Sequence, residues 1–427
     1  MPNEIAFEMA AGNRLRYGKG VTCEIGMDLA DMKVRRVMVL TDAYLAHQPP
    51  VAEVRQSLED NRVPYVFFDR VRIEPNDASF LDAIEVAKRE EVDAFVAVGG
   101  GSTMDTAKAA NLYSTYPADF LDYFAPPVGK GRQVPGPCKP LIAVPTTAGT
   151  GSEHTGIAVV DIETLHVKAA FVHQFTKPIR GIVDPDNTKT LPPQVAAATG
   201  LDVLSHVFES YTALPYYQRP RPERPSQRPP YQGSNPVSDV WCLDTLRTVA
   251  KYLIRAIEDP EDEEARSHML LASSLAGVAF ETAGVAMPHG LSYPIAGMVR
   301  QYRPEGYPPG DHPLAPHGIL VILTAPAVAR FTAPACPERH LKVAEILGAP
   351  VSQAKPEDAG KILADEIIAL IRRLKLHNGT AAVGFTREDI PQMVKGALRQ
   401  QRNLHNAPRF PSEDDLAQIY EESLVLW

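Results

Sequence analysis

Ala94-Phe-Val-Ala-Val98 is an apolar run that continues into Gly99-Gly-Gly101 and then into the polar segment Ser102-Thr-Met-Asp-Thr-Ala-Lys108. A short apolar run bounded by glycines predicts a buried strand, and the following segment predicts a helix, with Ser102 as its cap and Asp105 reaching back. Glycines allow the backbone to approach a ligand closely, and a helix start suits a pyrophosphate. A tight turn without a ligand is the alternative, because Met104 breaks the common G-x-G-x-x-G fingerprint.

Three further apolar runs extend this pattern, namely Val37–Thr41, Tyr65–Phe68 and Leu141–Val144. Polar segments of helical length separate them, and this alternation predicts a parallel sheet covered by helices. After about Pro192 helical spacing predominates. We therefore expect an α/β domain over residues 1–190 and an all-α domain over residues 191–427.

A second segment rich in glycine and hydroxyl groups, Pro145-Thr-Thr-Ala-Gly-Thr-Gly-Ser-Glu153, follows the last of these strands. Open parallel sheets bind ligands at the carboxyl ends of their strands, so the two glycine segments strengthen one another. Asp42 ends another strand and is placed to accept a hydrogen bond from a ribose hydroxyl. A carboxylate there repels a 2′-phosphate, which favours NAD over NADP; a plain turn residue is the alternative.

The helical half contains a candidate metal site. Asp202 and His206 are four residues apart and share one helix face, so that both can reach a single ion. His289 and His317, each followed by glycine, add two imidazoles, and one carboxylate with three imidazoles suits a divalent metal. Chance spacing among the 12 histidines is the alternative, because each one could instead be a hydrogen-bonded structural residue.

Composition excludes several classes of protein. The chain has 427 residues and a formal net charge of −9, whereas nucleic-acid binders usually carry a basic excess. Its four cysteines are widely spaced, which fits a reducing compartment. The uncharged stretch 282–299 contains two prolines and a histidine, so we do not expect a membrane span. The first residues resemble neither a secretory signal nor a transit peptide, so we expect a cytoplasmic location in a bacterium-like cell.

Together these motifs resemble the iron-containing (group III) alcohol dehydrogenase family, whose fold is shared with dehydroquinate synthase. The resemblance rests on Gly99-Gly-Gly-Ser-x-x-Asp-Thr-x-Lys108, on the 145–153 segment, on Gly200-Leu-Asp-x-x-x-His206 and on the two His-Gly pairs. It implies that residues 1–190 form a Rossmann-like NAD-binding domain and that residues 191–427 form a helical domain that binds the metal and the substrate. It implies four metal ligands: Asp202, His206, His289 and His317. It implies an NAD site that comprises Asp42, Gly100, Gly101, Ser102, Asp105, Thr146, Thr147 and Lys168.

The resemblance also implies an oxidoreductase that uses NAD and a divalent metal, with Fe²⁺ expected and Zn²⁺ as the alternative. Within the family, the chain resembles enzymes that move a hydride from 4-hydroxybutyrate to 2-oxoglutarate through NAD that stays bound. An ordinary NAD-dependent alcohol dehydrogenase, a lyase similar to dehydroquinate synthase and a metal-free binding protein are the alternatives. The expected partners are a small hydroxyacid and an oxoacid, without nucleic acid or membrane, and we expect a homo-oligomer.

Two features concern the substrate. Many relatives carry a histidine four residues after the third metal ligand, whereas this chain has Tyr293, which we take as the catalytic candidate for proton transfer, with simple packing as the alternative. The proline-rich segment 214–236 contains four arginines between Arg219 and Arg228. Because arginine pairs with carboxylates through two parallel hydrogen bonds, this loop is a candidate for recruiting the acids; a solvated basic loop is the alternative.

Overall fold

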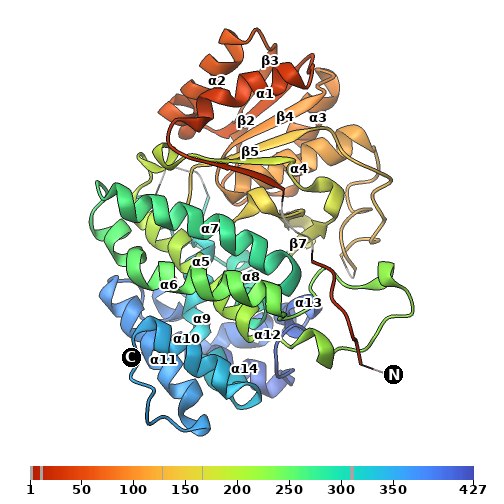
Figure 1. The fold of residues 1–427 in the computed structure, drawn as a ribbon. Helices are drawn as coiled ribbons and strands as arrows, with labels where there is room; N and C mark the ends of the chain where they lie inside the picture. The colour runs from red at the N-terminus through yellow and green to blue at the C-terminus, as the bar shows by residue number, and fades with distance from the viewer. Residues whose placement is uncertain (1–2, 10–12, 127, 166, 308–311) are drawn as a thin grey trace. The chain divides into compact units, whose positions relative to one another are not determined.

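The computed structural model describes residues 3–9, 13–126, 128–165, 167–307 and 312–427. The chain divides into two compact units. The first, here called the α/β unit, spans Ala11–Pro192. The second, here called the helical unit, comprises Met1–Ala10, Pro193–Tyr307 and Asp311–Trp427. Figure 1 shows the secondary structure of both units.

The α/β unit contains a six-stranded sheet in which all neighbouring strands run parallel. In their order across the sheet, the strands are β1 (Arg14–Tyr17), β8 (Arg180–Val183), β5 (Leu141–Pro145), β4 (Ala94–Gly99), β2 (Val37–Asp42) and β3 (Tyr65–Val71). The four predicted strands are β2, β3, β4 and β5. Because β2, β4 and β5 are neighbours, their carboxyl ends lie at one edge of the sheet.

Four helices cover the two faces of this sheet (Figure 1). They are α1 (Ile25–Asp31), α2 (Pro49–Asp60), α3 (Asp77–Arg89) and α4 (Gly101–Thr115). Alternate residues of β2 face opposite sides: Val37 and Val39 pack with α1 and α2, whereas Met38 and Leu40 pack with α3 and α4. Burial on both faces explains why the inner strands are continuous apolar runs.

The α/β unit also contains elements that the sequence analysis missed. β6 (Ile157–Ile162) and β7 (Val167–Val172) form an antiparallel hairpin after β5. The short strands β1 and β8 complete one side of the sheet. Helix α4 begins at Gly101 and its N-cap is Gly100, so the prediction that Ser102 caps this helix is wrong. The helix therefore starts at the third glycine, two residues earlier than a cap at Ser102 would place it.

The helical unit is built around α5 (Pro193–Thr212), which packs against α6 (Pro236–Glu258), α7 (Glu263–Ala283) and α9 (His317–Thr332). The remaining helices are α8 (Met287–Gly297), α10 (Pro337–Leu347), α11 (Ala359–Arg373), α12 (Ile390–Ala397), α13 (Gln401–Leu404) and α14 (Glu413–Leu424). The predicted fold class, a Rossmann-like α/β part followed by a helical part, is therefore confirmed.

Two predicted loops lie in the helical unit. Segment 214–235 contains the short 3₁₀ turns Tyr216–Gln218 and Pro225–Gln227, and α6 begins at Pro236. Arg228 pairs with Glu4, with Nε 3.1 Å from Oε2, and Arg219 donates to Asn406, so two of its four arginines have partners within this unit. Segment 302–316 is also predicted to be a loop because it is rich in proline, glycine and charged residues, but its positions 308–311 lie outside the described residues.

Helix α9 and the turn after it, His317–Ala335, are long and apolar enough to cross a membrane by composition alone. However, 78% of this stretch is buried inside the protein, as expected for the central helix of a bundle. Helices α7 and α8 pass the same test only as a pair, and they bend by 103° at the turn between them. That bend brings the start of α8 against α5.

Candidate metal centre and nucleotide site

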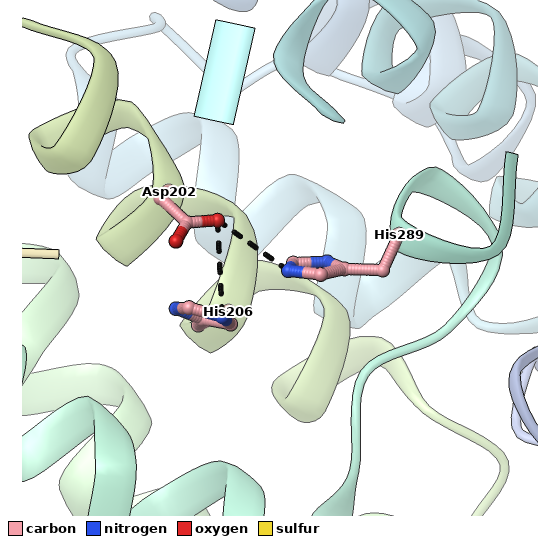
Figure 2. A group of neighbouring side chains, drawn as sticks. All are labelled: Asp202, His206 and His289. Atoms are coloured by element: carbon pink, nitrogen blue, oxygen red, sulfur yellow. Dashed lines mark ion pairs between the residues drawn. The ribbon is translucent and has the colours of Figure 1, made fainter. Parts of the chain in front are cut away.

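Asp202 and His206 project from one face of α5, one turn apart (Figure 2). Both side chains are buried, and 3.8 Å separates Asp202 Oδ1 from His206 Nε2. The His206 ring stacks on Phe280 of α7, with 4.3 Å between ring centroids and 16° between planes. Helical spacing thus brings the two groups together, and packing on α7 fixes the imidazole.

The two other predicted ligands come from different helices and reach the same carboxylate. His289, in the first turn of α8, places Nε2 3.4 Å from Asp202 Oδ1. His317, the first residue of α9, places Nε2 3.8 Å from the same oxygen. The structure therefore gathers all four predicted ligands around Asp202 Oδ1. Only the His317 side chain, 25% exposed, is open to solvent, which marks the side from which a substrate can enter.

The buried atoms at this centre fit a divalent cation. Among the described residues, neither Asp202 Oδ1 nor His289 Nε2 has a hydrogen-bond partner, and both residues are almost fully buried. Candidate ligand atoms of Asp202, His206 and His289 all lie within 4.8 Å of one another. Burial raises the pKa of Asp202, but the facing imidazoles outweigh burial and hold that pKa well below its ordinary value. A cation would satisfy the orphaned atoms, and nitrogen with carboxylate donors suits iron or zinc.

Glu209, which the sequence analysis did not assign, orients one of the imidazoles. Its Oε1 lies 2.6 Å from His289 Nδ1, and its Oε2 accepts hydrogen bonds from the backbone N–H of Ala286 at 2.6 Å and of His289 at 3.4 Å. Because an ionised carboxylate only accepts, a neutral His289 carries its proton on Nδ1 and directs the Nε2 lone pair toward Asp202. Asp202, His206 and Glu209 are spaced so that they share one face of α5, and this spacing was the signal that could have identified Glu209.

We expect Glu209→Gln to weaken divalent-metal binding by roughly 10- to 100-fold. The glutamine amide keeps the volume of the side chain but replaces one carboxylate oxygen by an N–H₂ group. This donor then faces an N–H group that needs an acceptor. The measurement is a competition titration of Zn²⁺ against a fluorescent chelator. Glu258→Gln, at an exposed position of α6, is the matched control and should bind like the parent protein. Equal affinities of all three proteins would show that the carboxylate does not support the site.

Tyr293 lies one turn after His289 on α8, and its ring stacks on His317 with 5.7 Å between centroids and 11° between planes. The side chain is mostly buried. Burial is the largest cause that raises the pKa of the Tyr293 hydroxyl well above its ordinary value, and Tyr231 adds to it. This hydroxyl therefore stays protonated at neutral pH beside the solvent-facing ligand, where it is able to donate a hydrogen bond.

In the α/β unit, the two glycine segments lie side by side at the ends of β4 and β5. Gly99 pairs with Pro145, and the backbone N–H of Thr146 donates to Gly99 at 3.1 Å. A Cβ on Gly101 would lie 2.7 Å from Thr150 Cγ2, and one on Gly100 would lie 3.2 Å from the Thr147 hydroxyl. A side chain at either glycine would have to displace a threonine side chain, so glycine favours this close approach between the start of α4 and the segment after β5.

Asp42 ends β2, the strand beside β4. Its Oδ1 accepts hydrogen bonds from the backbone N–H groups of Tyr44 and Leu45, both at 2.9 Å. Burial raises the pKa of this carboxyl above its ordinary value. The structure thus places Asp42 at the same sheet edge as both glycine segments and gives it a turn-forming role as well.

The three remaining predicted NAD residues take part in a polar network beside that edge. Asp105 Oδ2 accepts from the backbone N–H of Val159 at 3.0 Å, and burial raises the pKa of its carboxyl to about 6. Ser102 Oγ accepts from the Glu74 N–H at 3.2 Å, and Lys168 forms an ion pair with the Glu74 carboxylate. Asp105 therefore ties α4 to the β6–β7 hairpin instead of reaching back to Ser102.

Fold and metal centre together define a class, and the sequence comparisons agree with it. The model of the family described as iron-containing alcohol dehydrogenase matches residues 12–185, and the model of the C-terminal part of that family matches residues 231–424. The chain belongs to the iron-containing alcohol dehydrogenase family. Membership makes it an enzyme, and it implies NAD and a divalent metal without determining which metal.

Within that family, the chain is similar along its full length to hydroxyacid-oxoacid transhydrogenases. It is 56% identical to the mitochondrial enzyme of that name from Xenopus tropicalis over 426 residues, which cover 99% of this chain and 92% of the relative. The Homo sapiens enzyme is 53% identical, with coverages of 99% and 91%. Among solved structures, sulfoacetaldehyde reductase from Bifidobacterium kashiwanohense in complex with NAD⁺ matches with a TM-score of 0.79, 28% identity and 99% coverage of both chains.

These relatives overturn one expectation. The predicted cytoplasmic location is wrong as judged from them, because the transhydrogenases from Xenopus tropicalis, Rattus norvegicus and Homo sapiens are all mitochondrial enzymes. A targeting segment is read by its charge and amphipathic pattern rather than by any feature of the folded enzyme. The residues that build the fold and the metal centre therefore carry no information about compartment.

Proposed function

We propose that this chain is a hydroxyacid–oxoacid transhydrogenase that moves a hydride from 4-hydroxybutyrate to 2-oxoglutarate. The products are succinate semialdehyde and 2-hydroxyglutarate. The observation that carries the proposal is identity of 56% to an enzyme of this name over 99% of the chain, combined with a buried carboxylate and imidazole cluster. In this proposal residues 1–190 bind NAD, and residues 191–427 hold the metal and the acids.

Each predicted site residue has a task in this scheme. Asp202, His206, His289 and His317 hold the metal, for which we propose Fe²⁺, and Glu209 fixes the tautomer of His289. When bound, the metal polarises the substrate oxygen as a Lewis acid, and NAD stores the hydride between the two half-reactions. Asp42 accepts a hydrogen bond from a ribose hydroxyl, and the start of α4 with Gly100 and Gly101 receives the pyrophosphate. The other NAD-site residues of the proposal, Ser102, Asp105, Thr146, Thr147 and Lys168, shape the same groove.

Tyr293 supplies a proton-bearing group at the open side of the metal centre. Its hydroxyl is protonated at neutral pH because burial disfavours the phenolate. It can therefore donate a hydrogen bond to the substrate oxygen. This oxygen belongs to the hydroxyl group of 4-hydroxybutyrate in one half-reaction and to the keto group of 2-oxoglutarate in the other. The surrounding apolar helices exclude water, so that the hydride stored on the cofactor is transferred to the oxoacid and is not lost in a side reaction.

The test is an assay that contains no added NAD. Protein reconstituted with Fe²⁺ and NAD and then freed of unbound cofactor is given 4-hydroxybutyrate and 2-oxoglutarate, and both products are measured. We expect one 2-hydroxyglutarate for each succinate semialdehyde over many turnovers, because the bound cofactor is regenerated in each cycle. Turnover that requires added NAD and releases NADH from a simple alcohol would instead assign an ordinary dehydrogenase.

A further inference from the structure

Arg402 lies near the metal centre and has no carboxylate partner among the described residues. It lies in α13, is half-buried, and holds its guanidinium 4.7 Å from the centroid of the Tyr231 ring. Within the part of the chain that the structure describes, no acidic side chain forms an ion pair with it. The aromatic face holds the guanidinium in place and leaves its N–H groups available.

Asn403, the next residue, has an unused amide in the protein interior. Its side chain is 1% exposed, and neither its oxygen nor its nitrogen has a hydrogen-bond partner among the residues described. A buried polar group left without a hydrogen-bond partner destabilises the folded protein. An amide in this state is expected at a position where a ligand completes the hydrogen bonds.

Both residues lie beside the metal ligands. The Asn403 Cβ is so near Gly290, the residue after His289, that a Cβ on this glycine would lie 2.9 Å from it. Arg402 and Asp202 are both near enough to act electrostatically on the Tyr293 hydroxyl, which belongs to the ring stacked on His317. The arginine, the amide and the tyrosine therefore lie in the same part of the helical unit as the metal ligands His289 and His317.

We propose that Arg402 and Asn403 form the subsite that binds the distal carboxylate of both substrates, an assignment that rests on the proposed function. A guanidinium binds a carboxylate through two parallel charge-assisted hydrogen bonds, and the amide N–H₂ donates a further one. The bound carboxylate neutralises the arginine and accepts a hydrogen bond from the buried N–H₂ group of Asn403. Two of the four arginines of segment 214–236 differ in this respect, since Arg228 is paired with Glu4 and Arg219 with Asn406.

One subsite can serve both half-reactions because the two acids share a spacing. In 4-hydroxybutyrate, two methylene groups separate the carbon that bears the hydroxyl from the carboxylate. In 2-oxoglutarate, two methylene groups likewise separate the keto carbon from the distal carboxylate. An acid anchored at Arg402 and Asn403 therefore presents its reacting carbon at the same place in either direction, which is what an enzyme that alternates two substrates at one site requires.

The experiment compares 4-hydroxybutyrate with 1,4-butanediol, which replaces the carboxylate by a neutral hydroxymethyl group. The readout is the ratio of kcat/KM for the acid to that for the diol, in protein loaded with Fe²⁺ and NAD. We expect this ratio to fall roughly 100-fold in Arg402→Met, since a charged hydrogen-bonded pair is lost, and to fall less in Arg402→Lys, which keeps the charge but not the fork. Arg399→Met, an exposed arginine just before α13, is the matched control and should keep the parent ratio.

Asn403→Leu separates a binding role from a structural one. Leucine has a similar volume and removes the unpaired amide, so we expect the melting temperature to rise while the acid-to-diol ratio falls. A merely structural asparagine would lower stability when replaced. An unchanged ratio in both Arg402→Met and Asn403→Leu would overturn the proposal.

A binding measurement keeps this test independent of the proposed activity. Glutarate carries two carboxylates but no group that can react, and it should raise the melting temperature of the loaded parent protein and of Arg399→Met but not of Arg402→Met. If 4-hydroxybutyrate gave no turnover while this pattern held, the transhydrogenase assignment would fail and the carboxylate subsite would stand. Equal shifts in all three proteins would overturn the subsite.

Discussion

Asp202→Asn is expected to lose the metal and to reduce turnover by roughly 1,000-fold or more, because a Lewis acid supplies several kcal/mol of transition-state stabilisation. Asp202 Oδ1 is the atom that faces all three imidazoles, at 3.4–3.8 Å. The amide keeps the size of the side chain but removes its negative charge, so that a dication faces only neutral ligands and Tyr293. We expect bound iron or zinc, measured by elemental analysis, to fall from about one per chain to below a tenth.

Stability gives a second readout of the same substitution. Zn²⁺ should raise the melting temperature of the parent protein, since it binds only the native state, and should leave that of Asp202→Asn unchanged. Asp244→Asn, at an exposed position on α6, makes the same chemical change away from the site and should behave like the parent protein. Full metal content in Asp202→Asn would exclude this cluster as the metal centre.

The central part of the fold could be predicted because of how its strands are buried. β2, β4 and β5 are covered by helices on both faces, so each one is a continuous apolar run of the sequence. β1 is short and mostly exposed, and β6 alternates buried with half-buried residues, so neither gave a clear run. In these elements, pairing with neighbouring strands decides the structure more than local pattern does.

The positions of helices α8 and α9 could not be predicted from local pattern, for the opposite reason. Their residues are buried on nearly all sides, so no polar stripe reveals a helical period. Each also contains an internal proline, Pro294 and Pro326, which argues locally against a helix. Surrounding helices provide the burial that compensates for the lost backbone hydrogen bond.

The candidate site was predictable only in part. Asp202 and His206 share a helix face by their spacing. His289 and His317 are far along the chain, so spacing alone left a chance grouping open, and the resemblance to a family is what strengthened it. Glu209 was within reach of the same spacing argument. Arg402 and Asn403 were not, because only tertiary packing shows that a guanidinium lacks an acidic partner and that an amide is buried without a hydrogen bond.

Gly318→Ala is expected to destabilise the helical unit by about 3 kcal/mol and to disturb the metal centre at the same time. Gly318 follows His317 in the first turn of α9, where this helix crosses α5. A Cβ there would lie 2.0 Å from the Ala198 carbonyl oxygen and 2.9 Å from the Asp202 Cβ. Because the nearest obstacle is backbone, no side-chain rotation can relieve the clash, and the two helices must move apart.

That movement would carry His317 away from Asp202, so a loss of stability and a loss of metal affinity should appear together. Urea unfolding of the metal-free protein measures the first effect, and competition for Zn²⁺ measures the second. Gly297→Ala is the matched control: an added Cβ at the end of α8 meets nothing within 4 Å, and alanine favours the helix by roughly 0.5–1 kcal/mol. Wild-type metal affinity in a destabilised Gly318→Ala protein would show that the distance between α5 and α9 does not govern the site.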